Sequence, residues 1–463
     1  MMIKNILKTI VPKAIFDLYY RSLEHVAAAW FGMPSKKMIV IGVTGTKGKS
    51  TVVHLIGHFL EQAGYKIGWT SSIDFKIGDI LEANATKMTM PGRFALQKKL
   101  SRMVKAGCQY AIIETSSEGL VQFRHIGIEY DVAVFTNLSP EHIERHRSFE
   151  AYKTAKETLF QSLAQNASRK TFNQQMVQQV HHPERSRRKV LKISVVNTDD
   201  ASAPDFLQYP ADEKIGTTST PETGEALRSW LSWGVSAQHI RLSMYDTNFI
   251  LKAPQGSVEI HTKLMGIFNV ENILLASATV LSQGVPIDIV QRSLDMFEGV
   301  AGRMDRIDAS QGFTVFIDYA HEPKSLESVY QFCRSMLQNR GQGKLLCVLS
   351  AAGGGRDRWK RPVMGGLAEK YCDVVVLTNE DPYDENPEAI IEEIESGFTQ
   401  RVSQNFRILN RTEAIGKVLS LASNGDIVLL TGKGSESWIM GPNGSRIPWN
   451  EKKVVENVLK TLG

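Results

Sequence analysis

The chain has 463 residues, of which 42% are hydrophobic and 22% charged, a composition typical of a globular protein with a sizeable core. At roughly 100–200 residues per domain, this length predicts two or three domains. The formal net charge of +5 fits an anionic ligand, but a nucleic-acid-binding protein would need a clustered basic face, so we expect no nucleic-acid partner.

The cysteines and the N-terminal segment exclude two further classes of protein. The four cysteines form no C-x-x-C pair, so the sequence indicates neither a zinc site nor a disulfide framework, and isolated thiols fit a cytoplasmic location. In residues 1–37, charged residues interrupt the apolar runs, and none approaches the roughly 20 residues that span a bilayer. We therefore predict no transmembrane segment, but an amphipathic helix that packs on the next domain or rests on a membrane surface.

The first half of the chain alternates between strand and helix patterns. An apolar run at residues 38–43 predicts a buried parallel strand, and a Gly-rich turn and a helix at 49–62 follow it. Further strands are expected at 110–114 and 131–135, and further helices at 93–105 and 148–160. This alternation predicts a parallel sheet with helices on both faces.

The second half begins with a break in this pattern. Residues 166–189 are polar, Gln-rich and then basic, and we interpret them as a solvated insertion without chemistry. Helices at 269–281 and 288–297 follow. A second α/β pattern starts near residue 301, with strands expected at 314–318, 345–349, 374–377 and 427–430. Domain boundaries are therefore predicted near residues 37 and 300.

Residues 45–51 read GTKGKST and join a predicted strand to a predicted helix, which is the context of a phosphate-binding loop. Glycines turn backbone N–H groups toward phosphate oxygens, and the helix N-terminus adds partial positive charge. Lys49 would reach the terminal phosphates, and Ser50 would hold Mg²⁺. The expected phosphate contacts are Gly45, Thr46, Lys47, Gly48, Lys49, Ser50 and Thr51. The strict Walker spacing places Gly at position 43, where Val43 stands, so an ordinary Gly-rich turn is the alternative.

The segment IGVTGTKGKST resembles the ATP loop of the Mur ligase family, which also includes folylpolyglutamate synthetase and part of cyanophycin synthetase. Ten more motifs of the family follow in order: MTMPGR, ETSSEGLVQFRH, FTNLSPEHIERH, AYKTAKE, LMGIFNVEN, VAGRMDRID, IDYAHEPKSLES, GGGRDRWKRPVM, NEDPYDENP and TGKGSES. Over roughly residues 38–463, their order and spacing are most similar to the members that form UDP-N-acetylmuramoyl-tripeptide in peptidoglycan synthesis.

This resemblance implies a monomeric, ATP- and Mg²⁺-dependent ligase that adds diaminopimelate or lysine to a UDP-muramoyl-peptide substrate. In the family, a substrate carboxylate attacks the γ-phosphate of ATP to give an acyl phosphate and ADP, and the amine of a free amino acid then displaces phosphate. We expect an α/β fold with a helical extension (1–37), a central P-loop ATPase domain (38–300) and a C-terminal Rossmann-like domain that binds the amino acid (301–463).

The resemblance also assigns metal and catalytic roles. Glu114 ends a predicted strand, from which a carboxylate can reach a cleft above the sheet, and it matches the acidic metal ligand of the family. His142 matches the metal-binding histidine, and Glu with His suits a divalent cation. Lys156 matches a lysine that is carbamylated by CO₂ in the family. Lys153, one turn earlier, is the alternative.

Nucleotide contacts are expected from both domains. Arg303 resembles the arginine that meets the γ-phosphate when the domains close, with Asp305 where the family usually has Glu. Asn269 and Asn272 share one face at a helix start and resemble nucleotide-contacting asparagines, although either could be a helix cap. The contacts expected from the second domain are Asp318 and His321.

The substrate contacts match the family less uniformly. The matching positions for the UDP-sugar peptide are Thr89, Ser116, Gln122 and Arg124. Met90 stands where a second Thr is usual, and Glu118 replaces a common His. For the amino acid, the resemblance indicates Asp381, Gly432 and Glu436. Tyr383 replaces the arginine of diaminopimelate-using members, and Ser435 replaces a His. The extra carboxylates Asp384 and Glu385 suggest the hypothesis that a diamine such as lysine is preferred.

Two alternatives stay open at this point. Typical tripeptide synthetases carry an N-terminal domain of about 80–100 residues that holds UDP, whereas about 37 residues precede the predicted ATP domain here. The substrate could therefore be that of another amide ligase of the superfamily, of the folylpolyglutamate or cyanophycin type. A non-catalytic nucleotide-binding partner subunit is the other alternative. Against it argues the retention of five residues: Lys49, Glu114, His142, Lys156 and Arg303.

Overall fold

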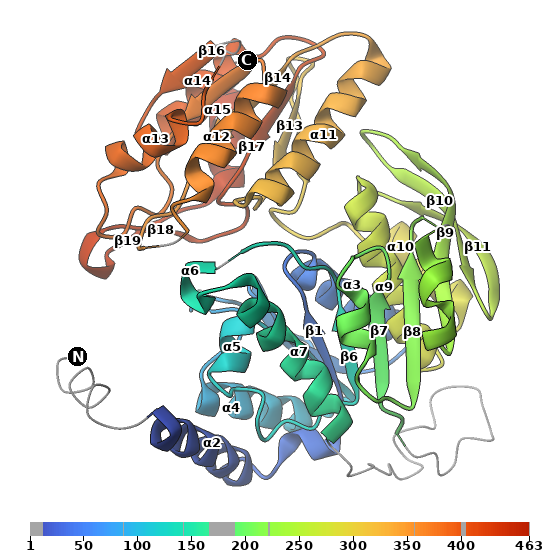
Figure 1. Ribbon diagram of the computed structural model, residues 1–463. Coiled ribbons are helices and arrows are strands. Elements are labelled where there is room, and N and C mark those ends of the chain that lie inside the picture. Colours follow the sequence, from blue (N-terminus) through green and yellow to red (C-terminus); the bar gives the residue numbers. More distant parts are fainter. Residues whose placement is uncertain are drawn as a thin grey trace.

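The computed structural model describes residues 13–86, 88–141, 143–165, 190–220, 223–355, 357–399 and 404–462. The metal-ligand candidate His142 and the predicted insertion at 166–189 lie outside the described residues. Within them the chain forms two α/β units, each built on its own sheet (Figure 1).

The first unit is an 11-stranded sheet in the order β11-β10-β9-β8-β7-β6-β1-β5-β2-β3-β4. β1 (Ile39–Thr44) lies between β5 (Tyr110–Glu114) and β6 (Val132–Phe135), and all three are parallel. The parallel part also contains β2 (Ile67–Thr70), β7 (Ile193–Asn197), β8 (Glu213–Thr218) and β9 (Trp233–Leu242). Antiparallel strands extend both edges: β3 (Asp74–Ile77), β4 (Ile80–Ala83), β10 (Thr247–Ala253) and β11 (Gly256–Thr262).

Helices cover both faces of this sheet. The side chains of successive residues in each parallel strand point to opposite faces, so each face has its own hydrophobic core. Ile41 of β1 packs in one core and Val40 in the other, as the two-residue period of a strand requires. The first core is covered by α3 (Lys49–Gln62), α9 (Ile267–Ser282) and α10 (Ile287–Met296). The second is covered by α4 (Arg93–Lys105), α5 (Ser117–Val121), α7 (Phe149–Gln165) and α8 (Ala203–Leu207).

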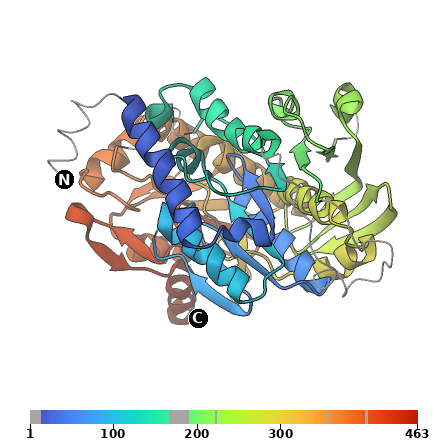
Figure 2. The same cartoon turned by 90° about the horizontal axis from the view of Figure 1, so that it is seen from below.

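The helix predicted within residues 1–37 is α2 (Lys13–Trp30), which packs against α4 (Figure 2). A short 3-10 helix, η1 (Pro34–Lys37), then leads into β1. In the described part of the chain, no helix combines the length and apolar character needed to cross a membrane.

The second unit is a 6-stranded sheet in the order β12-β13-β17-β14-β15-β16. Its parallel strands are β13 (Thr314–Ile317), β14 (Leu345–Leu349), β15 (Val374–Leu377), β16 (Gln404–Arg407) and β17 (Ile427–Leu430), and β12 (Asp305–Asp308) joins the edge antiparallel. The main helices of this unit are α11 (Pro323–Arg340), α12 (Lys360–Tyr371), α13 (Pro387–Glu395), α14 (Arg411–Leu421) and α15 (Glu451–Leu462). The small hairpin of β18 (Trp438–Met440) and β19 (Arg446–Pro448) follows β17.

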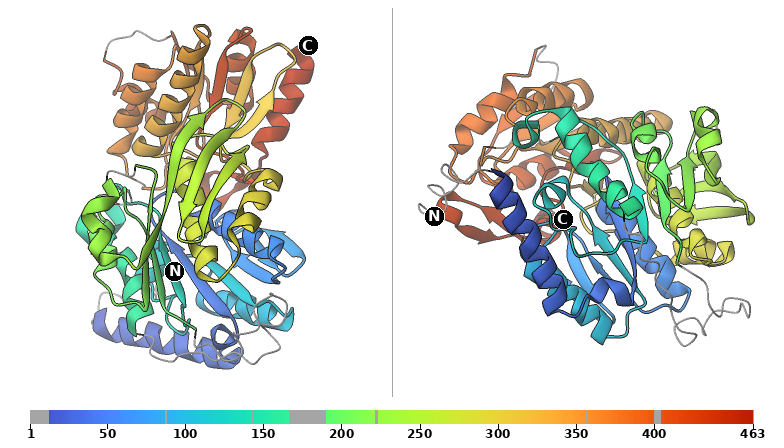
Figure 3. Two further views of the ribbon diagram at one scale, coloured as in Figure 1. Left: turned by 90° about the vertical axis from the view of Figure 1, so that its right-hand side faces the viewer. Right: turned by 60° about the horizontal axis from the view of Figure 1, so that its bottom comes forward.

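The second unit stacks on the first, as Figure 1 and the left view of Figure 3 both show. The short helix α6 (Ile143–His146) meets the loop before α12, where the Glu144 N–H donates to the Asp357 carboxylate (3.2 Å) and the Arg358 N–H to that of Glu144 (3.1 Å). Met244 of the first unit packs in one apolar cluster with Phe316 of the second. The carboxyl ends of the central strands therefore face the second unit.

The predicted α/β class with a parallel sheet is confirmed, and the predicted strands and helices appear within a few residues of their expected bounds. The antiparallel strands at the two edges of the first sheet were not predicted. Two of them, β3 and β10, alternate between buried and partly buried residues, as half-covered edge strands do, whereas the buried parallel strand β1 gives a continuous apolar run.

Candidate active site

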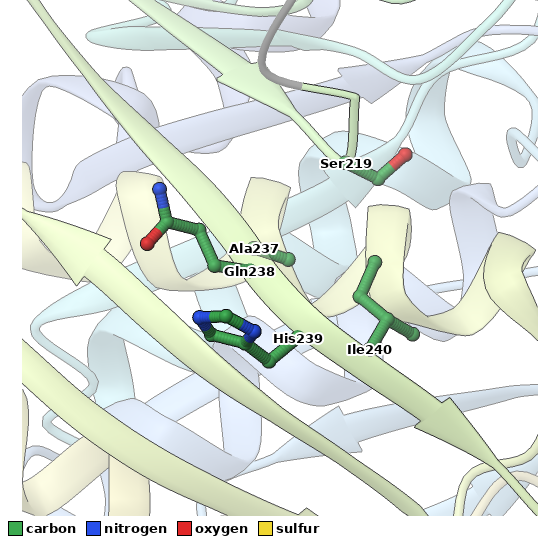
Figure 4. A pocket seen from close by; sticks show the side chains of 5 residues that line it. All are labelled: Ser219, Ala237, Gln238, His239 and Ile240. Atoms are coloured by element: carbon green, nitrogen blue, oxygen red, sulfur yellow. The ribbon is translucent and has the colours of Figure 1, made fainter.

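A cavity of about 970 Å³ lies at the carboxyl ends of the central strands, between the two units. This is the edge at which parallel α/β sheets generally bind ligands. Of the site residues expected from the sequence, all line this cavity except Gly45, Asp381, Gly432 and the undescribed His142. A shallower hollow of about 430 Å³ lies beside β9 and is lined by Ser219, Ala237, Gln238, His239 and Ile240 (Figure 4). None of the site residues expected from the sequence lines this hollow.

The loop at residues 45–51 is held in shape by its neighbours on both sides. A side chain at Gly45 (φ +144°) would lie 1.9 Å from the Thr136 hydroxyl, and one at Gly48 (φ +80°) 2.3 Å from the Asn272 amide oxygen. Only glycine fits such positions. The Thr46 N–H donates to the Asn137 carbonyl (2.8 Å), which fixes the loop against the segment after β6.

Lys49 and Ser50 lie where the loop turns into α3. The Lys49 ammonium donates to the Thr46 carbonyl (2.7 Å), and burial lowers the pKa of Lys49 although Glu114 and Glu141 oppose the effect. The Ser50 hydroxyl donates to the Glu114 carboxylate (2.9 Å), which also accepts from the Ser72 N–H (2.8 Å). A hydroxyl and a carboxylate side by side are oxygen ligands of the kind that Mg²⁺ prefers.

Lys156 comes from α7 and lies almost fully buried under the loop. Its Nζ donates to the Gly45 carbonyl (2.6 Å) and lies 4.5 Å from the centre of the Tyr152 ring. Burial, together with repulsion from Lys49, holds the pKa of Lys156 well below its usual value. Lys153 instead faces outward and pairs with Glu150 and Asp205, each at 3.0 Å. Of these two lysines, Lys156 is therefore the one that meets the loop.

The second unit adds a cation, a carboxylate and an imidazole to the cavity. The Arg303 guanidinium lies over the Tyr319 ring at 4.4 Å. Asp318 accepts from the N–H groups of Met304 and Ala320, both at 2.7 Å, and burial raises the pKa of Asp318. Burial and the nearby Lys47 ammonium lower the pKa of His321 to about 3, so its imidazole is neutral.

The two asparagines of α9 lie under the phosphate loop and are linked to each other. The Asn272 side-chain amide donates to the side-chain oxygen of Asn269 (3.2 Å), and the Asn269 side-chain amide donates to the Met265 backbone carbonyl (2.8 Å). The residue at the N-cap position of α9 is Gly266, so neither asparagine is the helix cap that the sequence left open.

The residues expected to contact the peptide substrate lie together in the cavity, beside α5. The Ser116 hydroxyl caps α5 by accepting from the Gly119 N–H (3.1 Å), and Arg124 donates to the Gln122 amide oxygen (2.6 Å). Thr89 lines the same part of the cavity. The carboxylate of Glu118, which stands where the family commonly has His, pairs with Arg145 (2.7 Å) at the rim.

The residues expected to bind the amino acid are already engaged with one another. The fully buried Lys433 ammonium donates to the carboxylates of Asp381 (2.9 Å) and Glu436 (2.6 Å). Glu436 still lines the cavity, whereas Asp381 and Gly432 do not.

The carboxylates of Asp384 and Glu385 also have partners within the protein. Glu385 pairs with the buried Arg361 guanidinium (2.9 Å), and Asp384 accepts from the Asn443 N–H (2.7 Å). Tyr383 packs its ring against Gly354.

Several cavity residues were not assigned from the sequence. Asn137 and Glu141 lie within the motif FTNLSPEHIERH and bond the backbone and side chain of Lys47, respectively (3.0 and 3.2 Å). The Tyr152 hydroxyl hydrogen-bonds the Thr46 hydroxyl (3.1 Å), and the motif AYKTAKE could have indicated it. Ser72, which bonds Glu114, follows a strand with no motif around it, so nothing in the sequence marked it.

A phosphate loop that faces a second α/β unit across a cavity rich in lysine, arginine and carboxylate defines a nucleotide-dependent group-transfer enzyme. Residues 43–280 match the Mur ligase middle domain, and residues 302–434 match the Mur ligase glutamate ligase domain. The chain therefore belongs to the Mur ligase family of ATP-dependent, ADP-forming amide ligases.

Named relatives that match nearly the whole of this chain support its membership in the family. The chain is 35% identical over 451 residues to the UDP-N-acetylmuramyl-tripeptide synthetase of Roseiflexus sp. (strain RS-1), covering 96% of this chain and 82% of that one. It is 33% identical over 429 residues to the UDP-N-acetylmuramoyl-L-alanyl-D-glutamate--2,6-diaminopimelate ligase of Bacillus cereus, covering 92% and 79%. A solved structure of a ligase of that name superposes with a TM-score of 0.59 at 27% identity, covering 92% of this chain and 79% of that one.

Proposed function

We propose that the protein adds the third amino acid, diaminopimelate or lysine, to UDP-N-acetylmuramoyl-L-alanyl-D-glutamate with ATP, as a monomer in the cytoplasm. The relatives whose names state this reaction are 32–35% identical to the chain over most of its length. The observation that carries the proposal is that one cavity contains the phosphate loop, the expected peptide-substrate residues and Arg303. Both partners of a phosphoryl transfer can meet there.

The reaction has two steps. A carboxylate oxygen of the peptide substrate forms a bond to the γ-phosphorus of ATP, and the bond between that phosphorus and ADP breaks. The amine of the amino acid then bonds the acyl carbon, the bond between that carbon and the phosphate oxygen breaks to release inorganic phosphate, and the amine loses a proton. Both steps gather negative charge at one place, so positioning and cations contribute more than a covalent nucleophile would.

The chain's own residues supply that charge. Lys49 lies at the end of the loop, where its ammonium can leave the Thr46 carbonyl for a terminal phosphate oxygen. Arg303, held over the Tyr319 ring, brings a second cation from the other unit. Arg124, beside the other peptide-substrate residues, suits an anionic group of that substrate. We propose that closure of the 301–463 unit on the 38–300 unit brings these cations together.

Magnesium fits the oxygen ligands at the loop. We propose that Ser50, Glu114, His142 and a carbamylated Lys156 hold it, with Ser50 and Glu114 already in contact. When bound, the ion neutralises phosphate charge and polarises the transferring group. A free Lys156 ammonium would oppose a cation at this place.

The proposed carbamylation is supported by the surroundings of Lys156. Its low pKa keeps a larger share of the amine neutral, and a neutral amine can attack CO₂. A nitrogen–carbon bond forms, a proton leaves, and the product is an anion in place of a cation. A mass spectrum of the intact protein under native conditions should show the gain of one CO₂, which Lys156→Ala should remove.

The experiment for the reaction is amino-acid-dependent release of ADP and phosphate from ATP. UDP-muramoyl-dipeptide with diaminopimelate or lysine should stimulate release, whereas a folate acceptor with glutamate should not. Phosphate release with the folate acceptor alone would contradict the proposal. An absence of stimulated turnover with every acceptor would favour a non-catalytic role.

A further inference from the structure

The outward side of α2 is apolar, whereas the protein-facing side of this helix carries a buried carboxylate. Glu24 is fully buried and pairs with Arg93 at the start of α4 (2.8 Å). Five large apolar side chains of α2 are each more than half exposed: Ile15, Leu18, Tyr19, Val26 and Trp30. A surface helix normally turns such side chains toward the core. The outward side of α2 therefore indicates a binding surface.

These five side chains form one continuous stripe, the α2 stripe. Intervals of three, four and seven residues separate them along the helix, which places them on one side of it at 3.6 residues per turn. Ser22 and His25 lie on the same side and are also exposed. Figure 2 shows α2 across the front of the molecule, with no described helix or strand in front of it. The stripe is therefore open to a flat partner along the whole helix.

The segment that contains α2 also concentrates positive charge. Residues 1–37 contain six Lys or Arg and two acidic residues, so they carry a net charge of +4, of the +5 of the whole chain. Their acidic residues are Asp17 and the buried Glu24, whereas Arg21 and Lys37 are exposed. An apolar stripe within a basic segment fits the surface of an anionic lipid bilayer. There, apolar side chains enter the boundary of the acyl chains, and cations meet the headgroups.

We propose that the α2 stripe docks the protein on the surface of an anionic phospholipid bilayer. Tyr19 and Trp30 suit the boundary between headgroups and acyl chains, because each ring has an apolar body and a polar atom at its edge. The helix lies along the surface, since the charged residues Asp17, Arg21 and Glu24 interrupt it and exclude a spanning orientation.

Docking through α2 leaves the cavity between the two units open. Figure 1 and the left view of Figure 3 both place α2 at the end of the first unit that is away from the second unit. A bilayer against α2 therefore does not lie between the units, and the proposed closure of one unit on the other can occur on the surface. The docking does not depend on which reaction the cavity performs, so it can be tested apart from the proposed function.

Co-sedimentation of the full chain with lipid vesicles tests the docking. Vesicles of phosphatidylcholine with about 30% phosphatidylglycerol should bind the protein at least about tenfold more tightly than vesicles of phosphatidylcholine alone, because several basic residues lie in the same segment as the stripe. Salt at about 0.5 M should reduce this difference, because it screens the attraction between the basic residues and the anionic headgroups.

A pair of double variants tests the stripe itself. Leu18→Gln with Trp30→Gln should weaken binding to the anionic vesicles by about tenfold or more, because it removes two apolar side chains of the stripe and leaves the charge unchanged. Ile447→Gln with Trp230→Gln is the matched control, since it changes one exposed aliphatic side chain and one exposed indole away from α2. It should bind as wild type does. Melting curves should show that both variants are folded.

Three results would overturn the proposal. They are an absence of wild-type binding to the anionic vesicles, equal wild-type binding to both kinds of vesicle, and equal binding by wild type and by the Leu18→Gln, Trp30→Gln variant. Analytical ultracentrifugation identifies the other occupant of the stripe. A wild-type dimer that this variant alone converts to a monomer, together with no vesicle binding, would assign the stripe to a second copy of the chain.

Discussion

At the phosphate-loop end of the cavity, Lys49, Ser50 and Glu114 line the open space and make hydrogen bonds to nearby backbone and hydroxyl groups, whereas at the amino-acid end Lys433 holds Asp381 and Glu436 in ion pairs. Both ends carry recognisable motifs. At the first end, glycines and the segment after β6 shape the backbone, so the loop conformation does not depend on ion pairs of these three side chains. At the second end, the charged side chains themselves hold the loops together.

A charged residue within a motif can bind the substrate or can hold the fold together. The neighbouring side chains decide which of these two roles it has. A buried lysine between two carboxylates is costly to disturb, because removal of one partner leaves an unpaired charge. Substitutions at the two ends should therefore differ in kind. Those at the loop should affect turnover, and those around Arg361 and Lys433 should first affect stability.

The largest effect is expected for Lys49→Ala. This variant should reduce kcat by at least about 10³-fold, since it removes a cation from the transferring phosphate, and its thermal unfolding should match wild type because Lys49 makes a single hydrogen bond to the loop. Steady-state ADP release and a melting curve check both parts. Retained turnover would break the assignment of the phosphate loop.

The next largest effect on kcat is expected for one of two lysines on α7, Lys156, and not for the other, Lys153. Lys156→Ala should reduce kcat by about 10²–10³-fold, because it removes a proposed ligand of the metal. Lys153→Ala, one turn away, loses only outward ion pairs and should keep kcat within about twofold. The kcat values of both variants should be measured side by side with added bicarbonate. Equal losses of kcat would show that turnover depends on the position on the helix and not on contact with the loop.

A smaller effect is expected at the amino-acid end, for Glu385→Gln. This change weakens the contact with the buried Arg361 and should lower the free energy of unfolding by about 1–2 kcal/mol. Although burial opposes it, the Gly355 N–H and Arg361 hold the pKa of Glu385 below its usual value. The stabilisation is thus present at neutral pH and lost as pH falls through the folded-state pKa, so the two unfolding curves should converge in acid.

The same variant sharpens the question of the preferred amino acid. If Glu385 serves the fold, the ratio of kcat/KM for diaminopimelate and lysine should stay within about threefold of wild type, well below the effect of a lost bidentate contact. A shift of this ratio by an order of magnitude, with unfolding unchanged, would return Glu385 to the role of a specificity residue.

The smallest effect is expected at the rim, for Glu118→Gln. The pair of Glu118 and Arg145 is about half exposed, with side-chain exposures of 52% and 53%. Such pairs contribute at most about 1 kcal/mol. Chemical denaturation should therefore place the variant within this range of wild type at low salt and closer at high salt. A larger loss that salt does not reduce would mean that this carboxylate does more than pair at the surface.

Much of the fold could be predicted because buried parallel strands and amphipathic helices leave strong patterns. The strand at 110–114 was predicted from a run of apolar residues and is β5. The edge hairpin of β3 and β4 was missed because strands of four residues each are too short to show a clear alternating pattern. The order of strands in the sheet also depends on contacts far apart in the sequence, which no local pattern contains.

The candidate site divides in the same way. Loop residues such as Gly48 and Lys49 were expected because their backbone requirements are local and visible. Ser72 was not, because its contact with Glu114 joins residues 42 positions apart without a motif. Nor could the sequence distinguish Lys156 from Lys153 by geometry, since the side that meets the loop is set by the packing of α7.

The most direct test of the central claim follows one oxygen atom. If the cavity activates a carboxylate by phosphoryl transfer, UDP-muramoyl-dipeptide labelled with heavy oxygen in its reacting carboxylate should give inorganic phosphate that contains one labelled oxygen per turnover. Mass spectrometry of the phosphate measures this directly. Unlabelled phosphate, with amide product formed, would contradict the acyl-phosphate mechanism and the role assigned to the loop.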